Sequence, residues 1–360
     1  MCCEGKGVSV DVEPEYRWPG VTYRTLRLLE EVPAPYPFRS HIYRSTFDVE
    51  GFAFCDRVEM YCIAEPGKRA LLIDTGHPDL CGVEALDGVS KRLGVPWERT
   101  EVFLSHFHDD HDGNLLYCAH KGAAKLYSGP TSDGDAALMN KFLVQSASTD
   151  LAGDSTFLYI RLVASGKKAQ TETRETRTEF HGGEELFIAG YNFEVLFTPG
   201  HTSNHLCLLD RSKKILFAGD HICLVPPGLM QYGKDEHLVK LYLDSLAQLK
   251  AMDLEAVYMC HHNPLLGSRE IDRFISMVEG RYESLVRRAR QLFVDVEEVT
   301  VREAARIGAT HYANGLEGFP RSTQIRRIST IFGTLEYLYD LGMLSRHTND
   351  DGALVYRRLW

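Results

Sequence analysis

The chain has 360 residues and lacks any apolar run close to the roughly 18 residues that a membrane-spanning helix needs. Its first segment, MCCEGKGVSVDVEPEY, also lacks the apolar stretch of a signal peptide. We therefore expect a cytoplasmic protein with no membrane partner. The hydrophobic fraction of 44 % and the charged fraction of 25 % are ordinary for a globular protein.

Paired cysteines are also missing. The chain has nine cysteines, an odd number, and no C-x-x-C pair. A disulfide framework and a structural zinc ribbon both depend on paired cysteines, so we expect neither. Cys2 and Cys3 are adjacent, and we interpret them as two free thiols. No G-x-S-x-G or other nucleophile motif is present, so no serine or cysteine nucleophile is identified.

Lysine is absent from residues 270–360, where 13 arginines balance 13 acidic residues. The first 269 residues hold 27 basic and 37 acidic groups, which accounts for the whole net charge of −10. An acidic body with a neutral C-terminal segment is a poor partner for nucleic acid. We therefore expect a small-molecule substrate and no nucleic-acid partner. A homodimer is an open alternative to a monomer.

Short apolar runs that end at polar residues fill the first two-thirds of the chain. Runs of this kind, bounded by Gly, Pro or charge, predict buried strands. They lie at residues 69–76, 100–108, 191–202, 213–221 and 255–262. Helices are predicted at 79–94 and 237–252, and Asn114 is predicted to cap another helix. The alternation predicts an α/β fold with functional groups at strand ends.

Three other segments have a distinct character. Residues 165–184 are polar and predict a solvated loop or polar hairpin, whereas residues 224–232 form an apolar loop suited either to an acyl group or to packing. After about residue 270, helical patterns precede two predicted strands around an Asp-Gly turn. Thr300 and Glu303 have the spacing of a capping box. The order predicts a small winged-helix domain, with a packing, dimerisation or lid role rather than DNA recognition.

The segment LSHFHDDHDGN, residues 104–114, gathers potential metal ligands at the end of a predicted strand. His106 and His108 point the same way if strand geometry continues. Asp110 and His111 follow where the chain turns, so the segment can supply ligands to two neighbouring metals. Burying so many ionisable groups for packing alone would cost several kcal/mol, because each loses its hydration.

Later strand ends offer three further ligands. His201 lies in TPGHTSNH, Asp220 in LFAGDH and His261 in MCHHNP. A carboxylate at Asp220 can bridge two cations. With the four residues of the first segment these make five histidines and two aspartates, a set suited to zinc, iron or manganese.

The ordered motifs LLIDTG, SHFHDDHDGN, TPGHT, AGDH and CHH resemble those of the metallo-β-lactamase fold superfamily. The resemblance covers about residues 20–268 and implies an αββα sandwich with a dinuclear site at one edge. It divides the chain into an N-terminal extension (1–19), a catalytic domain (20–268) and a winged-helix-like C-terminal domain (269–360).

The resemblance also assigns roles to the candidate residues. The first metal would be bound by His106, His108 and His201. The second would be bound by Asp110, His111 and His261, with Asp220 as the bridge. Asp74 would orient the site without binding metal. We expect two divalent ions, zinc first, with iron and manganese as alternatives.

Four histidines next to these motifs remain open. His262 follows His261 where the family often has glycine, so His262 is an alternative last ligand. His205 is interpreted as structural, while His221 either reaches substrate or only packs, and His77 is similarly open.

A water shared by two zinc ions has a pKa near neutrality, so the site predicts attack by a metal-bridging hydroxide, with Asp110 helping to manage the proton. The subgroup resemblance, to glyoxalase II-like and lactonase-like hydrolases with a C-terminal winged helix, implies a small thioester, ester or lactone as substrate. Only 41 positions separate Asp220 from His261, which disfavours the large insertion of many RNA-processing relatives. His108 stands where flavodiiron proteins have glutamate, which disfavours oxygen reduction as the reaction.

Three alternatives stay open. A sulfur dioxygenase would hold one iron through His106, His201 and Asp220. A phosphodiesterase or ribonuclease of the same fold would use both metals. A DNA-binding regulator would use the site as a sensor, which the neutral C-terminal segment disfavours.

Overall fold

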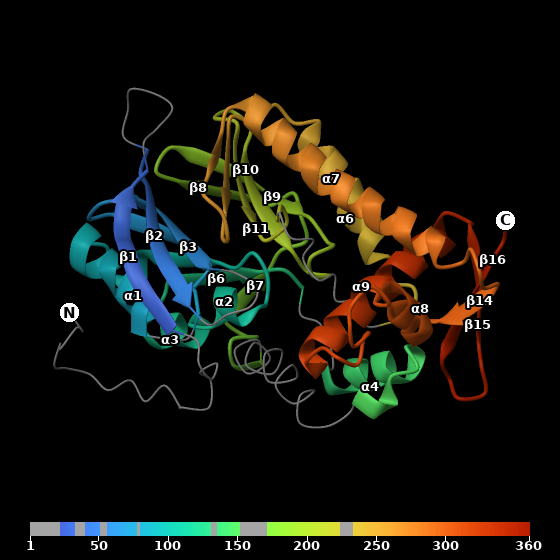
Figure 1. Cartoon of the computed structure of the whole chain (residues 1–360). Helices are drawn as coiled ribbons and strands as arrows, with labels where there is room; N and C mark the ends of the chain where they lie inside the picture. The colour runs from blue at the N-terminus through green and yellow to red at the C-terminus, as the bar shows by residue number, and fades with distance from the viewer. Residues whose placement is uncertain are drawn as a thin grey trace.

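The computed structural model describes residues 22–32, 40–50, 56–77, 80–130, 135–151, 171–223 and 233–360. The predicted N-terminal extension and the apolar loop 224–232 lie outside these ranges. Within them, two large sheets lie face to face, with helices on both outer faces (Figure 1). None of the described helices combines the length and the apolar character that crossing a membrane requires.

The first sheet is antiparallel at its start and parallel toward its other edge. Strands β1 to β4 pair antiparallel in sequence order, and β4, β5, β6 and β7 then pair in parallel. The strands are β1 (Thr22–Glu31), β2 (Ile42–Glu50), β3 (Arg57–Glu65), β4 (Arg69–Ile73), β5 (Thr100–Phe103), β6 (Lys125–Ser128) and β7 (Arg177–Glu179). The carboxyl ends of its parallel strands therefore meet at one edge.

The second sheet has the order β13-β12-β11-β10-β9-β8. Its one parallel pair in the described part of the chain is β11 with β12, which places the ends of these two strands together. The strands are β8 (Glu185–Ile188), β9 (Tyr191–Phe197), β10 (Leu206–Asp210), β11 (Ile215–Gly219), β12 (Ala256–Met259) and β13 (Leu265–Leu266). The predicted runs at 69–76, 100–108, 191–202, 213–221 and 255–262 are confirmed as β4, β5, β9, β11 and β12.

Three buried layers of apolar side chains account for the four-layer arrangement. Between the sheets, Ile63 of β3 packs with Phe193 and Phe217 of the second sheet. Outside the first sheet lie helices α1 (Leu80–Leu93) and α3 (Leu115–His120). Outside the second lie α6 (Leu238–Lys250) and α7 (Ser268–Gln291). Each fully buried Leu or Phe contributes about 1.5–3 kcal/mol, so these layers hold the sheets together. The predicted αββα sandwich is confirmed, as are the helices at 79–94 and 237–252.

The C-terminal part has its own apolar core, which also includes residues from earlier in the chain. It contains α8 (Val301–Gly308), α9 (Arg321–Asp340) and a sheet of β14 (Glu298–Thr300), β15 (Leu344–Thr348) and β16 (Leu354–Arg358) in the order β14-β16-β15. Phe142 and Leu143 of α4 (Asp135–Gln145) pack into this core, and Figure 1 shows α4 beside α8 and α9. The capping box of α8 and the predicted hairpin are confirmed. The winged-helix interpretation and the domain boundaries stay predictions.

Two local predictions are wrong. Part of the polar segment 165–184 is not a loop, since β7 pairs in parallel with β6. The buried guanidinium of Arg177 lies 5.0 Å from the Phe107 ring centre, so a charged residue packs inside an edge strand there. Asn114 holds the position before α3 but makes no side-chain cap. Its amide instead donates to the carbonyls of Thr75 and His77, which ties two loops together.

Candidate metal centre

The candidate ligands lie at one edge of the sandwich, where strands of both sheets end. The segment 104–108 follows β5, and the short helix α2 (Asp109–Asp112) continues it. From the second sheet, His201 follows β9, Asp220 follows β11 and His261 follows β12. Positions more than 150 residues apart in the sequence therefore reach one place, because β9, β11 and β12 run in the same direction and end at the edge of the sandwich where β5 also ends.

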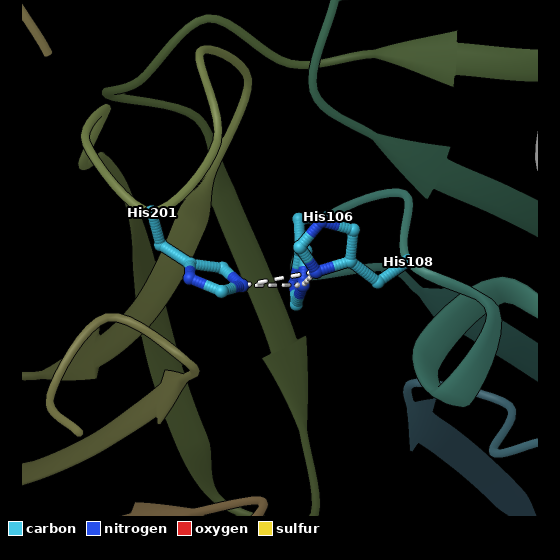
Figure 2. A group of neighbouring side chains, drawn as sticks. All are labelled: His106, His108 and His201. Carbon is cyan, nitrogen blue, oxygen red and sulfur yellow. Dashed lines mark hydrogen bonds between the residues drawn. The ribbon is translucent and has the colours of Figure 1, made fainter. Parts of the chain in front are cut away.

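His106, His108 and His201 form the three-histidine group, in which three imidazole nitrogens converge (Figure 2). Nε2 of His106 lies 2.8 Å from Nδ1 of His108, and Nε2 of His201 lies 3.2 and 3.0 Å from these two atoms. Tetrahedral coordination at zinc–nitrogen distances of about 2.05 Å separates ligand nitrogens by about 3.3 Å. The observed triangle is slightly smaller, so the three nitrogens already face the place where one ion fits.

Asp110, His111 and His261 form the mixed group. Nε2 of His261 lies 3.1 Å from Oδ2 of Asp110, and Nε2 of His111 lies 3.8 Å from the same oxygen. Each histidine turns its other nitrogen away from the group: Nδ1 of His111 lies 2.8 Å from Oδ2 of Asp74, and Nδ1 of His261 lies 2.9 Å from the carbonyl oxygen of Arg57. These acceptors fix the ring orientations, so that both Nε2 atoms face inward.

Asp220 faces both groups. Its Oδ2 lies 3.6 Å from Nε2 of His201 and 3.1 Å from Nε2 of His261, while its Oδ1 lies 3.4 Å from Nε2 of His111. That Oδ1 and that Nε2 are both buried, and neither makes a hydrogen bond with a described residue. A bound divalent ion would satisfy both atoms, which buried polar groups otherwise rarely leave unpaired.

Burial sets the protonation of the three-histidine group. It lowers the pKa of His201 to about 3, and together with the surrounding histidines it holds the pKa values of His106 and His108 below the usual range. Neutral imidazoles have a lone pair available for a metal, whereas imidazolium has none. The group is therefore ready to bind a cation at neutral pH.

The mixed group carries charge instead. Burial opposes ionisation of Asp220, but His261 and His111 hold its pKa well below the usual value, and Asp110 behaves alike. Burial also lowers the pKa of His111, but Cys260, Asp220 and other acidic neighbours outweigh it and raise that pKa well above the usual value. A proton on His111 thus supplies positive charge that the carboxylates require. A divalent ion supplies more, so the donor set fits a metal.

A second layer of hydrogen bonds supports the ligands. Asp74, at a positive φ of 62°, accepts from the backbone N–H of Ser105 at 2.7 Å and from its hydroxyl at 2.8 Å. The Ser105 oxygen lies 3.0 Å from Nδ1 of His106, and Asp74 also accepts from His111. One carboxylate is therefore linked to a candidate ligand of each group, and its role in orienting the site without binding metal stays a prediction. Strained backbone of this kind persists where surrounding bonds hold it.

Two neighbouring residues, Gly219 and His205, position Asp220. Gly219 has a φ of +48°, and a Cβ there would come within 2.7 Å of the Ser105 Cβ and within 2.9 Å of His205 Nε2. His205 Nε2 accepts from the Asp220 backbone N–H at 3.3 Å, and its Nδ1 lies 2.9 Å from the Thr198 hydroxyl. His205 therefore contacts Asp220 from outside the two ligand groups, and its structural role stays an interpretation.

The remaining histidines lie outside the two groups. His262 is partly exposed, with Nδ1 2.8 Å from the Asn263 carbonyl and its ring against Phe274, so the structure brings His261 and not His262 to the cluster. His221 has Nε2 2.7 Å from the Ser245 hydroxyl and is packed within the fold. His77 is buried, and burial lowers its pKa to about 4.

Sequence reasoning did not identify Ser105, Cys260 or the Arg57 carbonyl as parts of the site. The Cys260 thiol lies 3.6 Å from Asp74 Oδ2 and 3.7 Å from His111 Nδ1. Ser105 and Cys260 each directly precede a candidate ligand, which is the one signal in the sequence that points to them. A backbone carbonyl leaves no such signal.

A four-layer sandwich with a His/Asp cluster at its strand ends defines a class of metal-binding proteins. A family model described as the metallo-beta-lactamase superfamily matches residues 56–261, and the chain belongs to this superfamily. Its members use divalent metals; they are mostly hydrolases, although some are other enzymes such as flavodiiron proteins.

Two solved structures share the fold over nearly the whole chain. A metallo-beta-lactamase family protein from Thermus thermophilus is 21 % identical, with a TM-score of 0.58, and the match covers 95 % of this chain and 99 % of that one. A beta-lactamase domain protein from Burkholderia ambifaria is 16 % identical, with a TM-score of 0.71, and the match covers 92 % and 98 %. Both similarities therefore include the C-terminal part.

Proposed function

We propose that the protein is a dinuclear metal-dependent hydrolase of small thioesters, esters or lactones. The observation that carries the proposal is the position of Asp220 between two groups of converging ligands. The three-histidine group would hold one divalent ion and the mixed group the other, with Asp220 shared. Nitrogen and carboxylate ligands in this proportion favour zinc, with iron and manganese as alternatives.

If held by these residues, two ions would lower the pKa of a bound water molecule and would polarise an acyl carbonyl oxygen. The protein supplies the rest. Asp74 and the Arg57 carbonyl orient His111 and His261, so that their Nε2 atoms stay available. Oδ2 of Asp110 lies 3.1 Å from Nε2 of His261, and we assign to Asp110 the role of accepting a proton released during attack.

Several observations favour a small substrate over a nucleic acid. The chain between Asp220 and His261 includes α6 and β12 and has room for no additional large domain. The C-terminal part has equal numbers of basic and acidic residues, so it attracts phosphate backbones weakly. Membership of a superfamily composed mostly of hydrolases supports the reaction class.

We also propose that the C-terminal part is a winged-helix-like domain with a packing role. Its helix α9 makes hydrogen bonds and ion pairs with the segment just before α6. Glu336 accepts from the Asp235 backbone N–H at 3.0 Å, and His237 Nδ1 lies 2.9 Å from Asp340. Arg346 pairs with both Glu336 and Asp235. Through these contacts, part of the surface of the C-terminal part packs against the preceding part of the chain. This supports a packing role over DNA recognition.

The test is a substrate panel on zinc-loaded protein, comprising thioesters, carboxylic esters, lactones and phosphodiesters, with the Asp220→Asn protein as the control. We expect metal-dependent turnover of at least one acyl class and none with the variant. Turnover restricted to phosphodiesters or RNA would replace the proposal with a nuclease. A single iron per chain with oxygen consumption on a persulfide would replace it with a dioxygenase.

A further inference from the structure

A cavity of about 180 Å³ lies at the inner face of the first sheet. Its polar lining comes from three neighbouring strands and from the chain just after His261. The polar residues are Arg27, Arg44, Thr46, Arg57, Glu59 and Asn263. Three guanidinium groups and one carboxylate line this arginine cavity, so the side chains around it carry excess positive charge.

The arginines have spare hydrogen-bonding capacity. Arg44 is largely buried, with 14 % of its side chain exposed, yet its guanidinium makes no hydrogen bond with any residue that the structure describes. Its nearest acidic atom is Oε2 of Glu59, 3.6 Å from Nε. A guanidinium has five N–H donors in a planar fork. Most of the Arg44 donors are therefore available to a bound group.

Glu59 lies beside both Arg44 and Arg57 at the cavity wall. Its side chain is fully buried, its Oε2 accepts from the Thr46 hydroxyl at 2.7 Å, and burial raises its pKa. Arg44 and Arg57 lie 3.6 and 3.9 Å from its two oxygens. Arg27 lies 3.6 Å from Glu30, which is outside the lining, so Glu59 is left to balance both Arg44 and Arg57. The cavity therefore keeps excess positive charge even when Glu59 is ionised.

Arg57 contacts both the lining of the arginine cavity and a candidate ligand of the metal centre. The carbonyl oxygen of Arg57 lies 2.9 Å from Nδ1 of His261, and its guanidinium donates to Oδ1 of Asn263 at 2.7 Å. The Glu59 backbone N–H also donates to the Cys260 carbonyl at 2.7 Å. The residue that orients a candidate ligand thus also lines the cavity.

We propose that the arginine cavity binds a carboxylate group of the substrate while its acyl carbonyl lies at the metal centre. This inference rests on the proposed hydrolase function and narrows it to acyl compounds that carry a second, anionic group. A planar carboxylate matches the planar fork of Arg44 in a bidentate pair. The cavity exceeds the roughly 30 Å³ that one water occupies in the liquid, so it has room for such a group.

The kinetic test compares two thioesters of the same thiol on zinc-loaded, full-length protein. One has a succinyl group with a free carboxylate, and the other is its neutral methyl ester. We expect Arg44→Met to lower kcat/KM for the acid by about tenfold, mainly through KM, because a charge-assisted hydrogen bond is lost. For the neutral ester we expect a change below about twofold, since that ester has no anion for the cavity to bind.

Two further variants guard against misfolding and general charge effects. Arg44→Met/Glu59→Gln removes the buried carboxylate together with its partner, and we expect the same loss for the acid alone. Arg24→Met removes an exposed arginine of β1 that pairs with Asp48 and does not line the cavity. We expect Arg24→Met to behave like the wild type with both thioesters. Equal losses for acid and ester with Arg44→Met, or no loss, would overturn the proposal.

Calorimetric titration of the zinc-loaded proteins with succinate separates this proposal from the proposed function. Any direct binding to the metals is common to wild type and Arg44→Met, so their difference reports the cavity, and we expect about tenfold weaker binding by the variant. If no thioester is hydrolysed but this difference appears, the hydrolase proposal fails and the cavity stands. The same titration is repeated with inorganic phosphate in place of succinate. Equal binding of succinate by both proteins, or a difference between them seen only with phosphate, would overturn the carboxylate assignment.

Discussion

The three-histidine group and the mixed group lie side by side but prepare for a cation in opposite ways. Burial keeps His201 and its two neighbours neutral, with their nitrogens 2.8–3.2 Å apart. In the mixed group the carboxylates of Asp110 and Asp220 stay ionised, and His111 holds a proton between them. One group offers lone pairs and the other offers negative charge.

The difference explains why one carboxylate serves both groups. Three neutral imidazoles leave the charge of a divalent ion uncompensated, and Asp220 Oδ2 lies 3.6 Å from His201 to offset it. The mixed group has excess negative charge, so a second cation relieves repulsion there. The comparison implies that Asp220 matters to both ions and that each histidine matters mainly to one.

The largest effect should come from Asp220→Asn, which removes the charge shared by both groups. We expect turnover to fall roughly a thousandfold, beyond the roughly 10- to 100-fold typical of an outer partner. Steady-state kinetics at saturating zinc measure the loss. Retention of more than about a tenth of the activity would show that Asp220 does not serve both groups.

Single-ligand variants should separate the two groups. His201→Ala should lose the ion of the three-histidine group and His261→Ala that of the mixed group, so each protein should retain about one ion per chain because the other ligand set is intact. Elemental analysis after dialysis gives the count. Loss of both ions from either variant would mean that the groups bind metal only as one unit.

Asp74→Asn should weaken both groups at once. The amide keeps the shape but cannot accept from Ser105 and His111 as a carboxylate does. We expect metal affinity and kcat/KM to fall about 10- to 100-fold, the usual cost of losing an outer partner. Competition with a zinc chelator measures the affinity. A change in only one of the two ions would contradict the proposal that Asp74 supports both.

The two groups should respond to acid in opposite directions once metal is removed. His201 has a folded pKa of about 3, below its unfolded value, so its stabilising effect is lost as pH falls below about 6.5. His111 has a raised folded pKa, so its contribution is full below about 6.5 and declines as pH rises.

Urea unfolding of the chelated proteins at two pH values, about 7.5 and 5.5, tests this difference. Relative to wild type, His201→Asn should reduce the loss of stability at the lower pH, and His111→Asn should increase that loss. Shifts of the same sign in both variants would contradict the assigned protonation states.

The smallest effect should come from His262→Ala, the matched control for His261→Ala. His262 makes its hydrogen bond to Asn263 away from the cluster. We expect two ions per chain and kcat/KM within about twofold of wild type, as for a partly exposed residue outside the site. Loss of an ion would exchange the roles of the two histidines.

The sequence predicted which candidate residues lie together, because their geometry is local or follows from strand ends. Asp110 and His111 are close to His106 in the chain, so their proximity needs no tertiary knowledge. The end of a buried strand brings His201 to the same edge, and the family resemblance ordered the set. The choice of His261 over its neighbour agrees with its position in the structure.

The supporting residues were harder to predict because their contacts depend on register across strands. Arg44 and Glu59 meet because β2 and β3 pair with Thr46 opposite Glu59, and no residue type fixes that register. Asn114 stands at the position of a helix N-cap, but its side-chain amide donates instead to the carbonyl oxygens of Thr75 and His77. Such tertiary partners override local preferences.

The metal content per chain tests the central claim most directly. The protein should be purified without a chelator or a histidine tag and then examined by elemental analysis. Two groups that share Asp220 predict about two divalent ions per chain, with zinc predominant. One iron per chain, or no bound metal, would contradict a dinuclear centre held by these seven residues.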